Sequence, residues 1–167
     1  PPSGSRERWL RSRLMTVISE KEEFSPEDKA RLCYLYDQQI AFVDQHLGTL
    51  LTALGQTRSA RPTILFLTAD HGEELWEHGR CGHGHSLYDE CLRVPGILVL
   101  PDGQWRGRDE QRLVSLLDVA PTLTELAGLR PPRQWRGRSW LPLLRNPKRK
   151  QTREIRAESL VFGYEWK

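Results

Sequence analysis

Residues 63–90 read TILFLTADHGEELWEHGRCGHGHSLYDE, and this stretch decides the fold. Its first six residues form an apolar run that is too continuous to leave one face of a strand in water. Such strands lie inside parallel or mixed sheets that helices cover. Asp70 and His71 follow the run directly, and four of the five histidines of the chain lie within fifteen positions. In open α/β sheets ligands collect at the carboxyl ends of strands, so we expect a functional site here.

The flanking segments predict an α/β domain. Ser25 is a good N-cap, and apolar residues then recur at helical spacing, which predicts a long amphipathic helix over roughly 26–54. A second apolar run, GILVLP at 96–101, predicts another strand, and LLDVAPTLTELAG at 116–128 predicts a second helix. The run at 158–162 predicts a last strand. Together these elements predict an α/β layered domain with a mixed sheet flanked by helices.

Composition excludes several classes of protein. With 167 residues, 38% of them hydrophobic and 28% charged, the chain fits one globular domain. The net charge of +3 is too small and too scattered to indicate nucleic-acid binding. Three cysteines without a CxxC motif predict neither a disulfide framework nor a zinc ribbon. Residues 1–24 are polar and basic and are predicted to form an N-terminal arm, with the domain over 25–167.

Asp70 and His71 are candidate metal ligands. A hard carboxylate oxygen beside an imidazole nitrogen suits a divalent cation. Neighbouring residues on a strand point to opposite faces, so both reach one ion only where the strand breaks into a turn, which Gly72 allows. The alternative is that Asp70 caps the next helix and His71 packs.

His83 and His85 alternate with glycines in GHGHS, residues 82–86. On such a loop the imidazoles are exposed, and near neutral pH they suit an anionic oxygen or a leaving group. Two alternatives stay open: Cys81 and the two histidines hold a zinc ion, or the loop is solvated and its histidines have no role.

A series of landmarks resembles the sulfatases, within the alkaline-phosphatase-like superfamily of metal-dependent hydrolases. The resemblance covers about residues 25–145 and implies part of the layered domain of that superfamily. The landmarks, in the family's order, are YDQQIAFVDQHLGTLLTAL, TILFLTADHGEELWEHG, GHGHSLYDECLRVPGILVLP, VSLLDVAPTLTELAGL and RGRSWLPLL.

The resemblance implies a role for each candidate. Asp70 and His71 match two metal ligands, with calcium the usual ion among sulfatases and manganese, magnesium or zinc in related branches. His83 falls near the position where family members place a Lys or His on the sulfate oxygens and the bridging oxygen, as a catalytic and substrate-binding residue. His85 is the second predicted substrate ligand. The implied activity is hydrolysis of a sulfuric ester, with a sulfate ester, such as that of a sugar, as substrate.

Other family motifs do not occur in this sequence. The family's Cys- or Ser-x-Pro-x-Arg motif fits none of Cys33, Cys81 and Cys91, and no tandem aspartates follow an early strand. The chain therefore looks like the C-terminal part of a sulfatase catalytic domain, without its N-terminal half and inactive alone. An exported or membrane-associated protein would fit, although the sequence does not indicate the compartment.

Two other functions fit the same residues. One is a phosphoglycerol or phosphoethanolamine transferase or a phosphonate hydrolase of the same superfamily, which would act on a phosphate ester or a phosphonate. The other is a non-catalytic pseudo-enzyme or binding partner.

Overall fold

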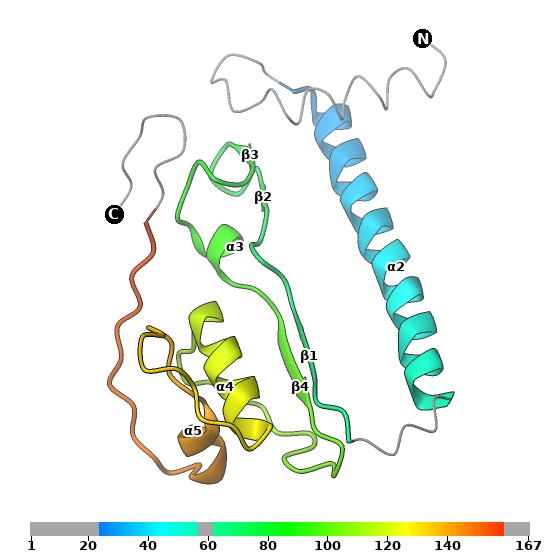
Figure 1. Ribbon diagram of the computed structural model, residues 1–167. Helices are drawn as coiled ribbons and strands as arrows, with labels where there is room; N and C mark the ends of the chain where they lie inside the picture. Colours follow the sequence, from blue (N-terminus) through cyan, green and yellow to red (C-terminus); the bar gives the residue numbers. More distant parts are fainter. Residues whose placement is uncertain (1–23, 57–61, 159–167) are drawn as a thin grey trace. The chain divides into compact units, whose positions relative to one another are not determined.

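The computed structural model describes residues 24–56 and 62–158, which belong to two compact units (Figure 1). The first unit contains 24–56 and 73–91, and the second contains 62–72 and 92–158. The predicted arm lies outside the described residues apart from Phe24, and so does the predicted last strand apart from Glu158. No helix among the described residues has both the length and the apolar character needed to cross a bilayer.

The first unit begins with the predicted long helix, α2 (Pro26–Gln56). Ser25 caps it as expected, because its hydroxyl oxygen accepts a hydrogen bond from the backbone N–H of Asp28 at 3.2 Å. Asp28 and Glu27 place negative charge at the positive end of the helix dipole. The helix runs two residues beyond the predicted end, which is within the ordinary fraying of a helix terminus.

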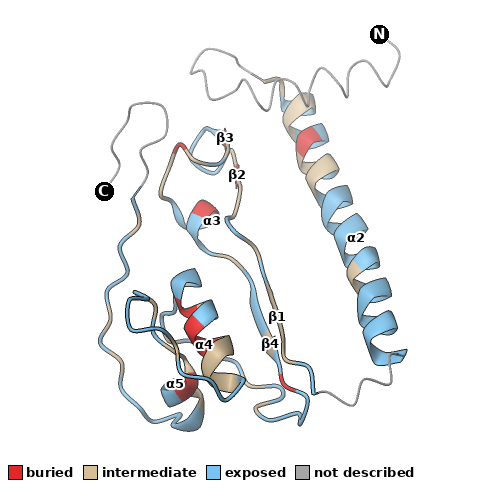
Figure 2. Cartoon of the chain, in the orientation of Figure 1, coloured by how far each residue is buried: buried red, intermediate tan, exposed pale blue. Residues whose placement is uncertain are grey.

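Most apolar side chains of α2 are exposed, and only Leu32 is buried among the described residues of this helix (Figure 2). The helix is therefore confirmed, whereas burial of its apolar face is not seen in the structure. The large exposed side chains are Tyr34, Ile40, Phe42, Val43, Leu50, Leu51 and Leu54.

A short antiparallel hairpin completes the first unit. Strands β2 (Glu74–Leu75) and β3 (Cys81–Gly82) pair with Glu74 opposite Gly82. The turn between them closes where the Trp76 N–H donates to the Arg80 carbonyl at 2.7 Å. The start of α2 contacts the hairpin, since the Phe24 ring meets the Trp76 ring edge-on at 5.7 Å. A short helix, α3 (Asp89–Leu92), follows the hairpin.

In the second unit both predicted strands form, as β1 (Leu65–Thr68) and β4 (Gly96–Val99). They pair antiparallel, and Phe66 stands opposite Leu98 while Leu67 stands opposite Ile97. Paired residues share a face, so Phe66 and Leu98 point to one side and Leu67 and Ile97 to the other.

Among the described residues the two faces of this strand pair are covered unequally. Ile97 is 52% exposed and Val99 is 51% exposed. Only the face of Phe66 and Leu98 meets the rest of the unit, where the Phe66 ring lies 5.2 Å from the Trp140 ring. The opposite face, which carries Ile97 and Val99, is the more exposed one among the described residues.

The predicted second helix also forms, with a tighter first turn. It begins as a 3₁₀ helix, η1 (Leu116–Asp118), and continues as α4 (Val119–Leu126). Gly128 follows with a φ of 77°, the left-handed conformation that ends helices. A further short helix, α5 (Leu141–Arg145), lies beside α4 on the same side of the strand pair.

A buried carboxylate joins three parts of this unit. Asp118 is 0% exposed, and its oxygens accept hydrogen bonds from the Ser115 N–H at 2.9 Å and the Arg138 N–H at 2.7 Å. The Trp140 indole N–H donates at 3.2 Å, and both terminal nitrogens of Arg153 donate as a fork, one of them at 2.9 Å. Asp118 therefore holds the start of α4, the segment before α5 and the chain near Arg153 together.

Two arginines hold the carboxyl end of α5. Arg108 and Arg112 both donate to the Leu143 carbonyl, at 3.0 and 2.8 Å, and satisfy a group that the helix end leaves unpaired. Glu110 lies between them and accepts from the Arg108 guanidinium at 2.9 Å. The hydrogen bond from Arg112 is the main reason that the pKa of Glu110 falls to about 2.

Candidate active site

Asp70 and His71 lie directly after β1, as predicted. The Asp70 side chain is 89% exposed, and its Oδ2 is 3.8 Å from Nε2 of His71. The His71 backbone N–H donates to Asp70 Oδ1 at 3.0 Å, which fixes the carboxylate against the turn. These two side chains are brought together, and neither of them caps a helix in the described chain.

The His71 ring has a defined orientation. Its Nδ1 is 2.8 Å from the Gly72 carbonyl oxygen, and because a carbonyl only accepts, Nδ1 carries the proton. In the neutral ring Nε2 then holds the lone pair, and it is this nitrogen that stands near Asp70. Two ligands each about 2.4 Å from a cation, at right angles or slightly more, are about 3.4–3.8 Å apart. The residues present therefore fit the edge of a cation site.

His83 projects from the loop after β3 and is half-exposed. Its Nδ1 lies 3.1 and 3.3 Å from the two carboxylate oxygens of Glu73. The carboxylate accepts, so Nδ1 is the donor. Gly82 and Gly84 flank His83 with φ values of 103° and 82°, which lets the loop turn sharply on both sides.

His85 lies in a different environment. It is 6% exposed, and its Nε2 is 3.0 Å from Oε2 of Glu74, which is itself 0% exposed. The glycine-rich loop was expected to leave both imidazoles in water, and for His85 that expectation is wrong. Its predicted role as a substrate ligand stays a prediction.

Glu74 holds four donors with one carboxylate. Oε1 accepts from the backbone N–H groups of His78 and Arg80, each at 3.1 Å. Oε2 accepts from His85 and, at 3.3 Å, from the Ser86 hydroxyl. Burial by itself would raise the pKa of Glu74, but the hydrogen bonds from His85, Arg80 and His78 outweigh it and leave the pKa below its usual value. Glu74 is therefore ionised at neutral pH.

The zinc alternative is not supported. His83 turns to Glu73 and His85 to Glu74, so the two imidazoles do not converge with Cys81. Cys81 is buried, and desolvation, with nearby carboxylates, raises the pKa of its thiol to about 12. A thiol that stays protonated is a poor zinc ligand.

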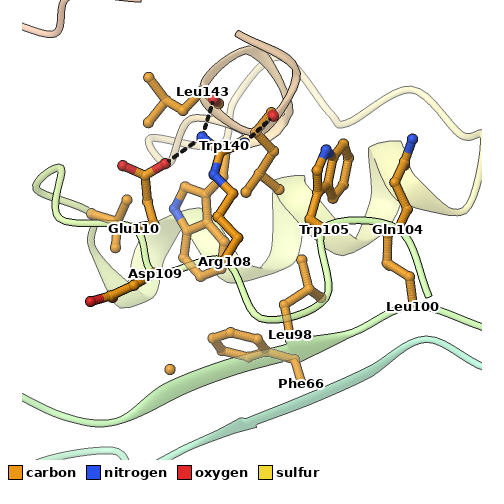
Figure 3. Close-up of a pocket in the computed structure, with 13 residues that line it drawn as sticks. Phe66, Leu98, Leu100, Gln104, Trp105, Arg108, Asp109, Glu110, Trp140 and Leu143 are labelled. Carbon is orange, nitrogen blue, oxygen red and sulfur yellow. Dashed lines mark hydrogen bonds and ion pairs between the residues drawn. The ribbon is translucent and has the colours of Figure 1, made fainter. Parts of the chain in front are cut away.

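The second unit also contains a pocket of about 200 Å³, lined by Phe66, Leu98, Trp105 and Trp140 among others (Figure 3). None of the predicted site residues lines it. The polar groups at its rim, Arg108 and Glu110, already bond to each other and Arg108 also to α5. This pocket belongs to the packing of the strand pair against α5 and not to the predicted site.

Glu73 and Glu74 are the site residues that the sequence did not single out. Their only signal is that they directly follow the Asp70–Gly72 turn. Nothing in the sequence tells which of them pairs with which histidine, ten and eleven residues further on.

Comparisons with known proteins agree on one family. A family model described as Sulfatase matches residues 15–129. Arylsulfatase K of Gallus gallus is 34% identical over 122 residues, which make up 73% of this chain and 22% of that protein. The Delta 4,5-hexuronate-2-O-sulfatase of Bacteroides thetaiotaomicron is 28% identical over 151 residues, 89% of this chain and 31% of that protein. The chain thus spans between a fifth and a third of the length of these relatives.

A solved structure is also similar. It shows a protein in complex with its substrate D-glucosamine-2-N,6-O-disulfate, with a TM-score of 0.59 and 31% sequence identity. The match covers 72% of this chain and 24% of that one.

Proposed function

Since this chain belongs to the sulfatase family, we propose that the polypeptide that carries it hydrolyses a sulfuric ester with the help of a divalent cation. The observation that carries the proposal is that the family match at 15–129 includes Asp70, His71 and His83. The proposal concerns the whole polypeptide, because the family's nucleophile motif does not occur in these 167 residues.

The proposed substrate is a sulfated sugar. One relative is named a hexuronate-2-O-sulfatase, another from the same bacterium is named N-acetylglucosamine-6-O-sulfatase, and the similar solved structure holds a disulfated glucosamine. These names belong to those proteins, and they support a sulfated monosaccharide unit as the first substrate class to test.

Asp70 and His71 are the proposed cation ligands, with calcium the first ion to test. When bound, the cation would neutralise negative charge on the sulfate group and the attacking oxygen. Asp70 supplies a carboxylate oxygen and His71 its Nε2, because Nδ1 is committed to the Gly72 carbonyl. Calcium takes about 6–8 oxygen ligands, so other parts of the polypeptide must complete the site.

His83 is the proposed proton donor to the leaving alcohol. Glu73 accepts a hydrogen bond from Nδ1–H of His83 and so fixes the orientation of the ring. Because Nδ1–H is committed to Glu73, Nε2–H is the proposed group that would give its proton to the bridging oxygen as the S–O bond breaks. In this scheme His83 also contacts the sulfate group, and His85, whose Nε2 is held by Glu74, stays a predicted second substrate ligand.

The test uses the complete polypeptide with a sulfated glucosamine and the matching phosphate ester. We expect hydrolysis of the sulfate ester, loss of activity on chelation, and recovery with calcium. Asp70→Ala should raise the calcium concentration needed for half-maximal activity at least tenfold, while Asp89→Ala, at an exposed carboxylate, should leave it unchanged. Faster turnover of the phosphate ester would assign the protein to phosphoryl transfer instead.

A further inference from the structure

We propose that Glu74 is a positioning residue that sets the place of His83 by holding the loop on both sides of it. The inference rests on the proposed function of His83 as proton donor. Glu74 would touch neither substrate nor cation and would act on His83 through the loop 78–86.

The first support is that Glu74 fixes the chain before His83. Glu74 pairs with Gly82 in the β2–β3 ladder, so its backbone defines where the residue preceding His83 lies. Its side chain accepts from the N–H groups of His78 and Arg80, and so holds the turn that leads into β3.

The second support is that the same carboxylate fixes the chain after His83. The Oε2 atom accepts from the His85 ring at 3.0 Å and from the Ser86 hydroxyl at 3.3 Å. His83 is thus an exposed residue within a loop whose two ends bond to one buried side chain. Gly82 and Gly84 give the loop little stiffness of its own, so these anchors must supply it.

The third support is the chemical demand at the site. Four donors converge on two oxygens, and a carboxylate is the side chain that accepts all four without offering a proton of its own. A glutamine would present an NH₂ group to one pair of donors and could accept only with the other oxygen. The negative charge of Glu74 is therefore needed to hold the loop, and an isosteric neutral residue should weaken these hydrogen bonds.

The consequence for catalysis is specific. A proton donor displaced by about 1 Å loses rate, while binding of the ester through other contacts is retained. Loss of the Glu74 charge should therefore lower kcat more than it changes KM. The loss should be large for an alcohol that needs a proton to leave, and small for 4-nitrophenyl sulfate, whose leaving group is stable as an anion.

The experiment compares Glu74→Gln with Asp89→Asn, a matched loss of charge at an exposed position, in the complete polypeptide. For Glu74→Gln we expect kcat for the sulfated sugar to fall at least tenfold, kcat for 4-nitrophenyl sulfate to fall less than threefold, and KM to stay within threefold. Glu74→Asp, which keeps the charge, should recover part of the loss. Hydrogen exchange should become faster across 78–86 in Glu74→Gln and stay unchanged in Asp89→Asn.

Combining Glu74→Gln with His83→Ala distinguishes a failure of the role proposed for Glu74 from a failure of the proposed function. In the His83→Ala background Glu74→Gln should cause no further loss of kcat, because the residue that it positions is gone. An equal loss for both esters, or unchanged exchange across 78–86, would overturn the role of Glu74 and leave the proposed function intact. The proposed function would be overturned if the wild-type protein hydrolysed no sulfate ester, or if His83→Ala left kcat unchanged. In either case the hydrogen-exchange data would still test whether Glu74 holds the loop 78–86.

Discussion

Asp118→Asn is expected to be among the most destabilising conservative changes in this chain. The carboxylate is completely buried and accepts from four groups, one of them the Arg153 guanidinium, whose side chain is 13% exposed. Asparagine keeps the shape but turns an NH₂ group towards donors and leaves a buried guanidinium without its counter-charge. Breaking one partner of a buried ion pair costs about 3–5 kcal/mol, which for a domain of this size lowers Tm by about 10 °C.

The pH dependence gives this prediction a sign. Burial raises the pKa of Asp118, but the hydrogen bonds from Arg153, Arg138, Ser115 and Trp140 outweigh it, and the pKa in the folded protein lies below the ordinary value of 3.8. A depressed pKa contributes stability that is present above the unfolded value and is lost as the pH falls through the folded value. The difference in unfolding free energy between wild type and Asp118→Asn should therefore be constant near neutral pH and shrink below about pH 4.

The assay is urea unfolding followed by tryptophan fluorescence at several pH values, with Asp109→Asn at an exposed position as the control. The control should change the free energy of unfolding by less than about 0.5 kcal/mol. A loss below about 1 kcal/mol for Asp118→Asn, or a loss that does not change with acid, would refute the view that Asp118 joins three parts of the unit through its charge.

Three further predictions concern other residues. Glu110→Gln should lower the free energy of unfolding by about 1–2 kcal/mol at neutral pH and by almost nothing near pH 2, because the Arg112 hydrogen bond holds the Glu110 pKa at about 2. Unfolding curves at both pH values measure this, and an equal loss at both would contradict it. Cys81, with a pKa of about 12, should resist iodoacetamide at pH 8 until the chain is unfolded, which peptide mass mapping would detect; rapid labelling of the native chain would contradict its burial. Gly137→Ala should lower Tm strongly, since the new Cβ would lie 1.8 Å from a backbone oxygen. Gly48→Ala has open space around it in α2 and should raise the free energy of unfolding by about 0.5–1 kcal/mol. A calorimetric scan in which Gly48→Ala has the lower Tm of the two would contradict this packing.

Local signals in the sequence predict α2, β1, β4 and α4, but not the β2–β3 hairpin or the short helices α3 and α5. Ser25 and the helical spacing that follows it predict α2 to within two residues, because capping and periodicity are properties of neighbours along the chain. The same is true of Gly128, which ends α4 in the left-handed conformation that favours glycine. The position of Asp70 and His71 after an apolar strand is also a local pattern, and the structure places them where it indicates.

Pairings between distant residues are not predictable in this way. The sequence marks His83 and His85 as equivalent, since both stand between small residues on one loop, yet one is half-exposed and the other is 6% exposed. The difference follows the partners: Glu73, whose side chain is 22% exposed, meets His83, whereas Glu74, which is completely buried, meets His85. No spacing rule shows which histidine meets which glutamate.

The sequence by itself therefore determined the two main helices, the β1 and β4 strands and the family, since each depends on residues close together in the chain or on a fixed series of motifs. Only the tertiary structure decided which polar side chains become structural. Asp118 and Glu74 resemble ordinary surface acids in the sequence, but each is fully buried and accepts hydrogen bonds from residues that the fold brings to it, up to 35 residues away for Asp118 and up to 12 for Glu74. Burial of a charge is stable only when its partners are in place, and those partners are assembled by the fold and not by the sequence around the residue.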